Sequence, residues 1–136
     1  MSAPFYRVQR LLYKHLKDNT TITVVDENRD ATPKTKEYWI RVDFLPGQPW
    51  PAGLGESAPN RYDGLMQLTL NCPKDKSWGE PRRKADELCD VFKRGTRLVE
   101  GDLVVTIEKS WSHHGMEGGA DYELPVTVSW FCYADN

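Results

Sequence analysis

The sequence predicts an α+β fold, in which a mixed or antiparallel β-sheet has two amphipathic helices packed on one face. Two segments repeat apolar residues at helical spacing, and several others alternate apolar and polar residues, as half-buried strands do. The strands also follow one another in hairpin-like pairs, which favours antiparallel neighbours. With 136 residues, 39% of them hydrophobic, the chain can bury a core, and we expect one domain over residues 1–136.

The first expected helix spans Pro4–Lys17, and Ser2 is placed to cap it. Its apolar residues recur every three or four positions and form one stripe: Phe5, Val8, Leu12 and Leu16. Its other positions are rich in cations: Arg7, Arg10, Lys14 and Lys17. This basic face would suit a nucleic-acid partner, but a solvated outer face accounts for it as well.

Two strands and the loop between them occupy the centre of the chain. A short β-branched strand over Thr20–Val25 and a polar connection over Asp26–Lys36 come first. Tyr38–Phe44 and Tyr62–Leu70 then alternate apolar and polar residues, which predicts two half-buried strands. The loop between them protrudes at about residues 46–60, and its prolines and glycines predict that neither helix nor sheet runs through it.

The second expected helix runs from Ser77 to about Arg94. Ser77 and Glu80 have the spacing of a capping box, and Gly95 is a natural stop after the helix. The residues expected toward the core are Trp78, Ala85, Leu88, Cys89 and Phe92.

The C-terminal third is expected to contain two or three strands. Leu98–Glu100 and Leu103–Lys109 flank a tight turn, Ser110–Gly119 is a glycine-rich loop, and Tyr122–Tyr133 alternates again. Pro125 lies within this last strand and predicts an edge position or a bulge, because proline cannot donate to the ladder.

The sequence contains no recognisable catalytic, cofactor or metal motif. It has neither a phosphate-binding loop nor a nucleophile elbow, and its three cysteines form no CxxC pair, so we expect no enzyme activity, cofactor or metal. His113 and His114 point apart on an extended segment, so they could hold an ion only with Glu117, Asp121 or a partner chain. A net charge of -2 argues against a dedicated nucleic-acid binder, and no apolar run predicts a signal peptide or membrane helix.

Aromatic residues are the clearest surplus in the composition. The chain has five tryptophans and six tyrosines, and Trp50, Trp78 and Trp111 fall in or beside loops. Aromatic anchors in irregular segments suit protein–protein interfaces, although packing over the ends of the sheet accounts for them equally well.

Several segments, taken in order, resemble a known family. They are Trp39–Gly47 (WIRVDFLPG), Leu54-Gly55, Arg61–Leu68 (RYDGLMQL) with Cys72-Pro73 after it, and a helix that leads from Trp78-Gly79-Glu80 to Ala85–Phe92 (ADELCDVF). In this order the chain resembles the phage tail terminator proteins of long, non-contractile, lambda-type tails. The resemblance is one of pattern, covers nearly the whole chain and contains no catalytic motif.

The resemblance implies a structural virion protein that is made in the host cytoplasm and has no membrane segment. Such proteins form a hexameric ring at the head-proximal end of the tail tube. The ring stops polymerisation of the tube protein and presents a docking surface to the head–tail connector. DNA passes through its lumen without sequence-specific binding. The expected partner-binding residues, for the tube, the connector or a neighbouring subunit, are Trp50, Leu54, Gly55, Arg61, Trp111, His113 and His114.

Three alternatives stay open at this point. The first is a head–tail connector or stopper component of the same virion. The second is a small host domain that binds a metal or ligand through His113, His114 and a carboxylate. The third is a nucleic-acid binder that uses the basic face of the first helix.

Overall fold

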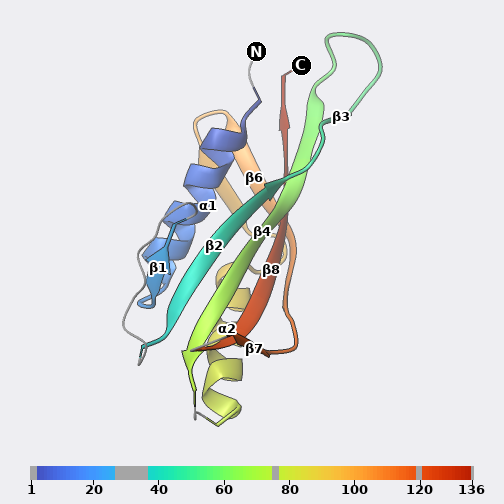
Figure 1. Ribbon diagram of the computed structural model, residues 1–136. Coiled ribbons are helices and arrows are strands. Elements are labelled where there is room, and N and C mark those ends of the chain that lie inside the picture. The colour runs from blue at the N-terminus through green and yellow to red at the C-terminus, as the bar shows by residue number, and fades with distance from the viewer. Residues whose placement is uncertain (1–2, 27–36, 75–76, 119–120, 136) are drawn as a thin grey trace.

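The computed structural model describes residues 3–26, 37–74, 77–118 and 121–135, which form two helices and a sheet of eight strands (Figure 1). The helices are α1 (Phe5–Asn19) and α2 (Gly79–Val91). The strands are β1 (Thr23–Val25), β2 (Trp39–Pro46), β3 (Trp50–Pro51), β4 (Asn60–Pro73), β5 (Arg97–Glu100), β6 (Leu103–Ser112), β7 (Met116–Gly118) and β8 (Asp121–Ala134). Their order in the sheet is β1-β2-β4-β8-β6-β5, with β3 paired to β4 and β7 paired to β8.

Strands β4 and β8 form the centre of the sheet. Each spans 14 residues, and they pair antiparallel along their whole length, from Asn60 with Ala134 to Pro73 with Asp121. β1 pairs with β2 in parallel, whereas every other pairing in the described sheet is antiparallel. The prediction of an α+β fold with a mixed sheet is therefore confirmed.

Rows of apolar residues cross the sheet on its core side. Three consecutive rows join β2, β4 and β8: Ile40, Leu70 and Leu124; Val42, Leu68 and Val126; Phe44, Met66 and Val128. All nine side chains are buried, and they form one cluster with Val8, Leu12 and Leu16 of α1 and with Ala85, Leu88 and Phe92 at α2. The apolar stripe predicted for α1 is confirmed, and that of α2 is confirmed for Ala85, Leu88 and Phe92 but not for Trp78. That both helices cover one face of the sheet stays a prediction.

An aromatic group closes one end of this core. The buried Trp130 ring stacks on Phe44, with 5.5 Å between the centroids, and Phe5 of α1 meets Trp130 edge-on at 6.2 Å. Gly64 is paired with Trp130, and a Cβ at Gly64 would lie 2.5 Å from the Leu45 carbonyl oxygen and 2.9 Å from the indole. A side chain at this position would therefore displace the aromatic group or the backbone.

Helix α1 extends two residues past its predicted end and begins after Pro4, which occupies the N-cap position. Ser2, the expected cap, lies outside the described residues, as does most of the connection expected over Asp26–Lys36. β1 is shorter than the strand predicted from Thr20, because only its last three residues pair with β2.

The predicted capping box of α2 is wrong. The helix begins at Gly79, so Trp78 is its N-cap residue, Ser77 lies before the cap, and no side chain caps the helix. Trp78 is also 81% exposed rather than directed to the core, because it precedes the buried stripe that starts at Pro81. The helix ends at Val91, and Gly95 takes a φ of +87°, which glycine adopts without strain.

Two segments expected to be loops contain strands. β3 lies within the 46–60 loop and pairs with the start of β4, so sheet does run through this segment. β6 continues through Ser112 and β7 follows at Met116, so most of the segment predicted as a loop over Ser110–Gly119 belongs to the sheet. Glycine and proline weaken a strand locally, but here long-range pairing with β4 and β8 outweighs that preference.

Pro125 lies in the middle of the sheet, so the expected edge position is wrong. It pairs with Thr69 of β4 on one side. On the other side, β6 stops pairing with β8 at Val126 and β7 starts at Glu123, and the Pro125 carbonyl accepts the His113 N–H at 2.9 Å. The N and C=O of a strand residue point to the same side. The proline nitrogen, which has no hydrogen to donate, therefore faces the gap between β6 and β7. The register shift in β6 lies elsewhere, between Ile107 and Lys109.

The three cysteines are free, and Cys72 and Cys132 are buried as small hydrophobic residues. Cys89 is only half-buried. Burial raises the pKa of the Cys72 and Cys132 thiols to about 11 each, and for Cys72 the neighbouring Asp121 and Glu80 add to this effect. Both thiols therefore stay protonated in the folded protein at neutral pH.

Replacing Phe92 with alanine removes a fully buried ring from the contact between the α2 end and the core. We expect the free energy of unfolding to fall by about 3–5 kcal/mol, measured by urea denaturation. Trp78→Ala is the matched control on the same helix and should change stability by less than about 0.5 kcal/mol, because this indole is exposed. Equal losses for the two variants would contradict the packing of α2.

The buried thiols predict a loss of stability in alkaline solution. In the unfolded chain they ionise near pH 9, whereas in the folded protein they hold their protons up to about 11. Ionisation therefore favours the unfolded state as pH rises through this window. The stability of wild-type protein should fall more steeply between pH 9 and 11 than that of a Cys72→Ala/Cys132→Ala variant, as measured by urea denaturation under reducing conditions. Parallel curves would show that the thiols do not contribute.

Candidate partner-binding surface

The hairpin that joins β2 to β4 projects from one end of the sheet (Figure 1). Beyond β3, the Ala52 N–H donates to the Pro59 carbonyl at 2.9 Å, and Gly55 turns the chain with a φ of +92°. Residues 48–57 are all exposed. Leu54 is 100% exposed and Trp50 is 59% exposed, so this hairpin presents apolar side chains without a covering element.

A row of three large side chains crosses the sheet where the hairpin begins. Trp50 of β3, Arg61 of β4 and Tyr133 of β8 lie directly opposite one another, on the face away from the core. The Arg61 guanidinium carbon lies 4.2 Å from the centroid of the Phe131 ring, and Phe131 meets Tyr133 edge-on at 5.8 Å. Tryptophan, tyrosine and arginine are the residues that most often dominate binding energy at protein interfaces.

Two carboxylates hold Arg61 in this position. Its Nε lies 3.5 Å from Asp63 Oδ2, and its Nη2 donates to Glu108 Oε1 at 3.2 Å. Partial burial acts to lower the pKa of Arg61, but Tyr133, Glu108 and Asp63 raise it above its ordinary value. The guanidinium is thus a fixed, permanently charged group over an aromatic ring, which needs little ordering when a partner binds.

The exposed apolar surface continues from this row along the outward face of the sheet. Leu45 of β2 and Leu65 of β4 are paired with each other and are both exposed. Leu65 in turn pairs with Ser129 of β8, one row beyond Phe131. Together with the hairpin tip, these side chains form what we call the hairpin surface: Leu45, Trp50, Leu54, Gly55, Arg61, Leu65, Phe131 and Tyr133.

Trp111 and His113 lie in a second group, on the same outward face but beside the middle of β8. Trp111 pairs with Thr127, and its ring lies 5.0 Å from the Lys109 ammonium and 5.7 Å from the His113 ring. His113 Nε2 is 2.7 Å from the Thr127 hydroxyl oxygen. His114 is exposed beyond the end of β6.

The predicted site residues therefore fall into two separate groups. Trp50, Leu54, Gly55 and Arg61 lie in the hairpin or in the row of Tyr133. Trp111, His113 and His114 lie near Thr127, six residues or about 20 Å from Tyr133 along β8, and the row of Leu65 and Ser129 lies between the two groups. The sequence prediction missed Phe131 and Tyr133. Their signal was present, because the alternation in the last strand directs them opposite to the buried Trp130 and Cys132.

The described residues contain no group of three or more histidine, cysteine, aspartate or glutamate side chains that could hold a metal ion. His113 is oriented by a hydroxyl, and the Asp121 carboxylate accepts the Trp39 indole N–H at 3.2 Å. The arrangement suggested for the host-domain alternative, two histidines with a nearby carboxylate, is therefore not formed in this part of the chain.

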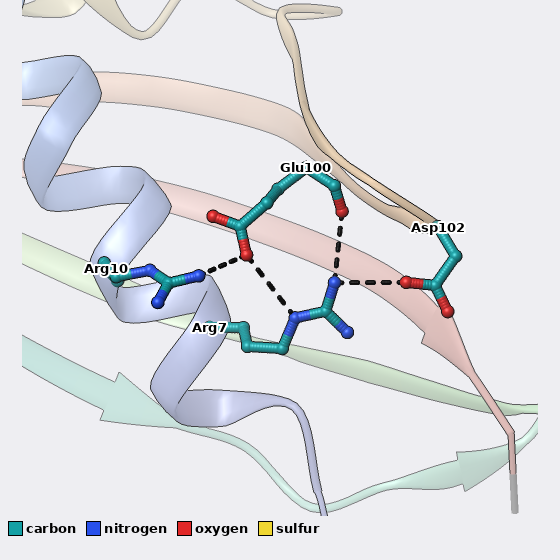
Figure 2. A network of polar contacts seen from close by, with 4 residues as sticks. All are labelled: Arg7, Arg10, Glu100 and Asp102. Atoms are coloured by element: carbon teal, nitrogen blue, oxygen red, sulfur yellow. Dashed lines mark hydrogen bonds and ion pairs between the residues drawn. The ribbon is translucent and has the colours of Figure 1, made fainter.

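Figure 2 shows how the basic face of α1 is used. The Arg7 Nη2 donates to the Glu100 carbonyl and to Asp102 Oδ1, each at 3.1 Å, and Arg10 pairs with the Glu100 carboxylate. The hydrogen bond from Arg7 lowers the pKa of Asp102. Lys17 lies 3.1 Å from Asp26. These partly exposed pairs add little stability, but they neutralise three of the four cations of α1, and those of Arg7 and Arg10 attach the helix to the β5–β6 turn.

The fold and the surface together define a small α+β domain whose exposed aromatic and leucine side chains lie on a hairpin and one sheet face, a pattern typical of proteins that assemble with other proteins. A family model described as "Phage tail terminator protein" matches residues 7–130, so the chain belongs to the phage tail terminator family. The resemblance to tail terminators is confirmed. Its lambda-type detail stays a prediction.

A solved structure supports the fold independently. It has a TM-score of 0.69 with this chain at 18% sequence identity, and the match covers 91% of this chain and 94% of the other. No curated protein matches the chain. No helix in the described residues is long and apolar enough to cross a membrane.

Family membership gives the protein a structural role in completing the phage tail. It is a component of the virion tail that interacts with tail and head components, and the family is one of structural proteins rather than enzymes.

The tip of the hairpin should be dispensable for folding. Replacing residues 52–59 with Asn-Gly joins Pro51 to Asn60 through a two-residue turn that suits antiparallel strands. The tip contributes no buried side chain, so we expect the free energy of unfolding to change by less than about 1 kcal/mol, measured by urea denaturation, while tail assembly is impaired. Loss of cooperative unfolding would show that the tip belongs to the core.

Proposed function

We propose that the protein closes the head-proximal end of the tail tube as a hexameric ring. In this role it stops polymerisation of the tube protein and forms the docking surface for the head–tail connector, and DNA passes through the ring without sequence-specific contacts. The observation that carries the proposal is the family match over residues 7–130. The protein is made in the host cytoplasm before it joins the tail.

The two exposed groups supply the contacts that this role needs. A ring subunit must offer two different surfaces to its neighbours and further surfaces to the tube and the connector. The hairpin itself and the group of Trp111, His113 and His114 are six residues apart along β8, so they can contact different partners at the same time. We assign both groups to contacts with the tube, the connector or a neighbouring subunit.

Tail length tests the proposed function directly. Phage particles assembled with this gene disrupted should have overlong tails that carry no heads, measured by negative-stain electron microscopy, and expression of the wild-type gene in trans should restore normal length. Tails of normal length that fail to join heads would assign the protein to the connector instead. Intact, infectious virions would remove it from the neck of the phage.

A further inference from the structure

We propose that a groove on the outer face of α1 receives the tip of the β2–β4 hairpin from a second copy of this chain. This inference rests on the proposed ring and names the contact between its neighbouring subunits. It follows from the chemistry of the two surfaces and from their positions on the molecule.

The hairpin tip has the properties of an inserted element. Its fully exposed Leu54 stands beside the turn at Gly55, and the two-stranded base fixes the direction in which it projects. Glu56 is the one charged residue in the sequence from Gly47 to Asn60, so the tip carries a net charge of -1. A partner that binds it must cover a leucine and accept a nearby carboxylate.

The groove on α1 matches this requirement. It has a volume of about 530 Å³, and it is lined by the rings of Tyr6 and Tyr13, the cations Arg10, Lys14 and Lys17, the amide of Gln9 and the carboxylate of Asp18. Tyr6 is 75% exposed, and its ring lies 5.5 Å from the Arg10 guanidinium carbon. Tyrosine rings cover an apolar side chain well, and Lys14 is the lining cation that can meet the carboxylate of the tip, because Arg10 and Lys17 already pair with Glu100 and Asp26.

The hairpin of the same chain is not the occupant. The first turn of α1 packs near the base of the hairpin, where Phe5 meets Tyr62 edge-on at 5.6 Å, but Figure 1 shows the hairpin tip projecting beyond the end of the sheet and away from the helix. The contact therefore needs a second copy. It joins two different surfaces, so it is a heterologous contact, and repetition by rotation closes a ring.

A nucleic acid fits the groove less well than a protein. Binding to phosphates relies on several uncompensated cations, but Arg7 and Arg10 are engaged by Glu100 and Asp102, and Lys17 by Asp26. The apolar lining of the groove would also remain uncovered by a phosphate backbone. A leucine flanked by one carboxylate matches both the tyrosine rings and the cationic part of the lining.

Cross-linking in purified tails tests the contact. A Leu54→Cys/Tyr6→Cys chain, treated with a short bis-maleimide, should give a ladder of covalent oligomers, since each copy offers both reactive sites. A mixture of the two single variants should give dimers at most, and either single variant alone should give none. Wild-type tails are the control for the native cysteines, of which Cys72 and Cys132 are buried.

Two results would overturn the inference. One is the absence of cross-links from the double variant in tails of normal length. The other is dimer formation by one single variant alone, which would show that like surfaces meet. Neither result bears on the proposed function, which fails only if gene disruption leaves tail length and head joining unchanged.

A charge reversal provides a second measurement, which does not require an introduced cysteine at the contact. Lys14→Glu should lower the amount of the protein on purified tails several-fold, whereas Lys93→Glu, a matched reversal on an exposed lysine outside the groove, should not. The groove is a nucleic-acid site instead if the purified wild-type protein retains duplex DNA at physiological salt, Lys14→Glu abolishes this retention, and the same variant is incorporated into tails as well as wild type.

Discussion

The pairing of β4 with β8 over 14 residues is the constraint on which the rest of the structure depends. Side chains alternate along a strand, so a slip of one residue would exchange every inward and outward position. In the observed register Trp130 is buried and Phe131 faces out. Gly64 helps to hold this register, because the Trp130 ring and the Leu45 carbonyl occupy the space that a Cβ would need. One pairing thus determines both the core and the outward face.

The same register positions the candidate binding surface. β4 runs without a break from the core into the base of the hairpin, so the residues that face outward at Leu65 and Asp63 are followed by Arg61 on the same face. β3 then adds Trp50 to that row and β8 adds Tyr133. The surface is therefore as rigid as the sheet at its base, while the tip beyond β3 is held mainly by its own turn.

Periodicity predicted most of the fold, because burial on one face leaves a local signature. The stripe of α1 and the alternation of Met66, Leu68 and Leu70 were visible without any knowledge of partners in the sheet. β3 and β7 were missed, because their glycines and prolines oppose strand formation locally and only distant strands stabilise them. The capping box failed for a similar reason: the spacing is a local signal, whereas packing set the start of α2 at Gly79.

The candidate site was predictable only in part. Trp50 and Leu54 were conspicuous as apolar residues in a segment rich in proline and glycine. Phe131 and Tyr133 belong to the hairpin surface only because β8 lies beside β4. The order of strands in a sheet cannot be deduced from the pattern of one strand. The sequence likewise listed four cations on α1 without showing that Glu100 and Asp102, some ninety residues away, neutralise two of them.

The chemistry of these surfaces suggests that each subunit contact is weak by itself. The hairpin tip offers one leucine and one carboxylate, and most cations of α1 are already paired, so neither apolar area nor charge is large enough for a tight binary complex. In the proposed ring every subunit would make this contact twice, and loss of one subunit would break two contacts at once. Subunits already held at the end of a tube are also at a high effective concentration. If the proposed ring is held by weak heterologous contacts, it forms on the completed tube rather than free in solution.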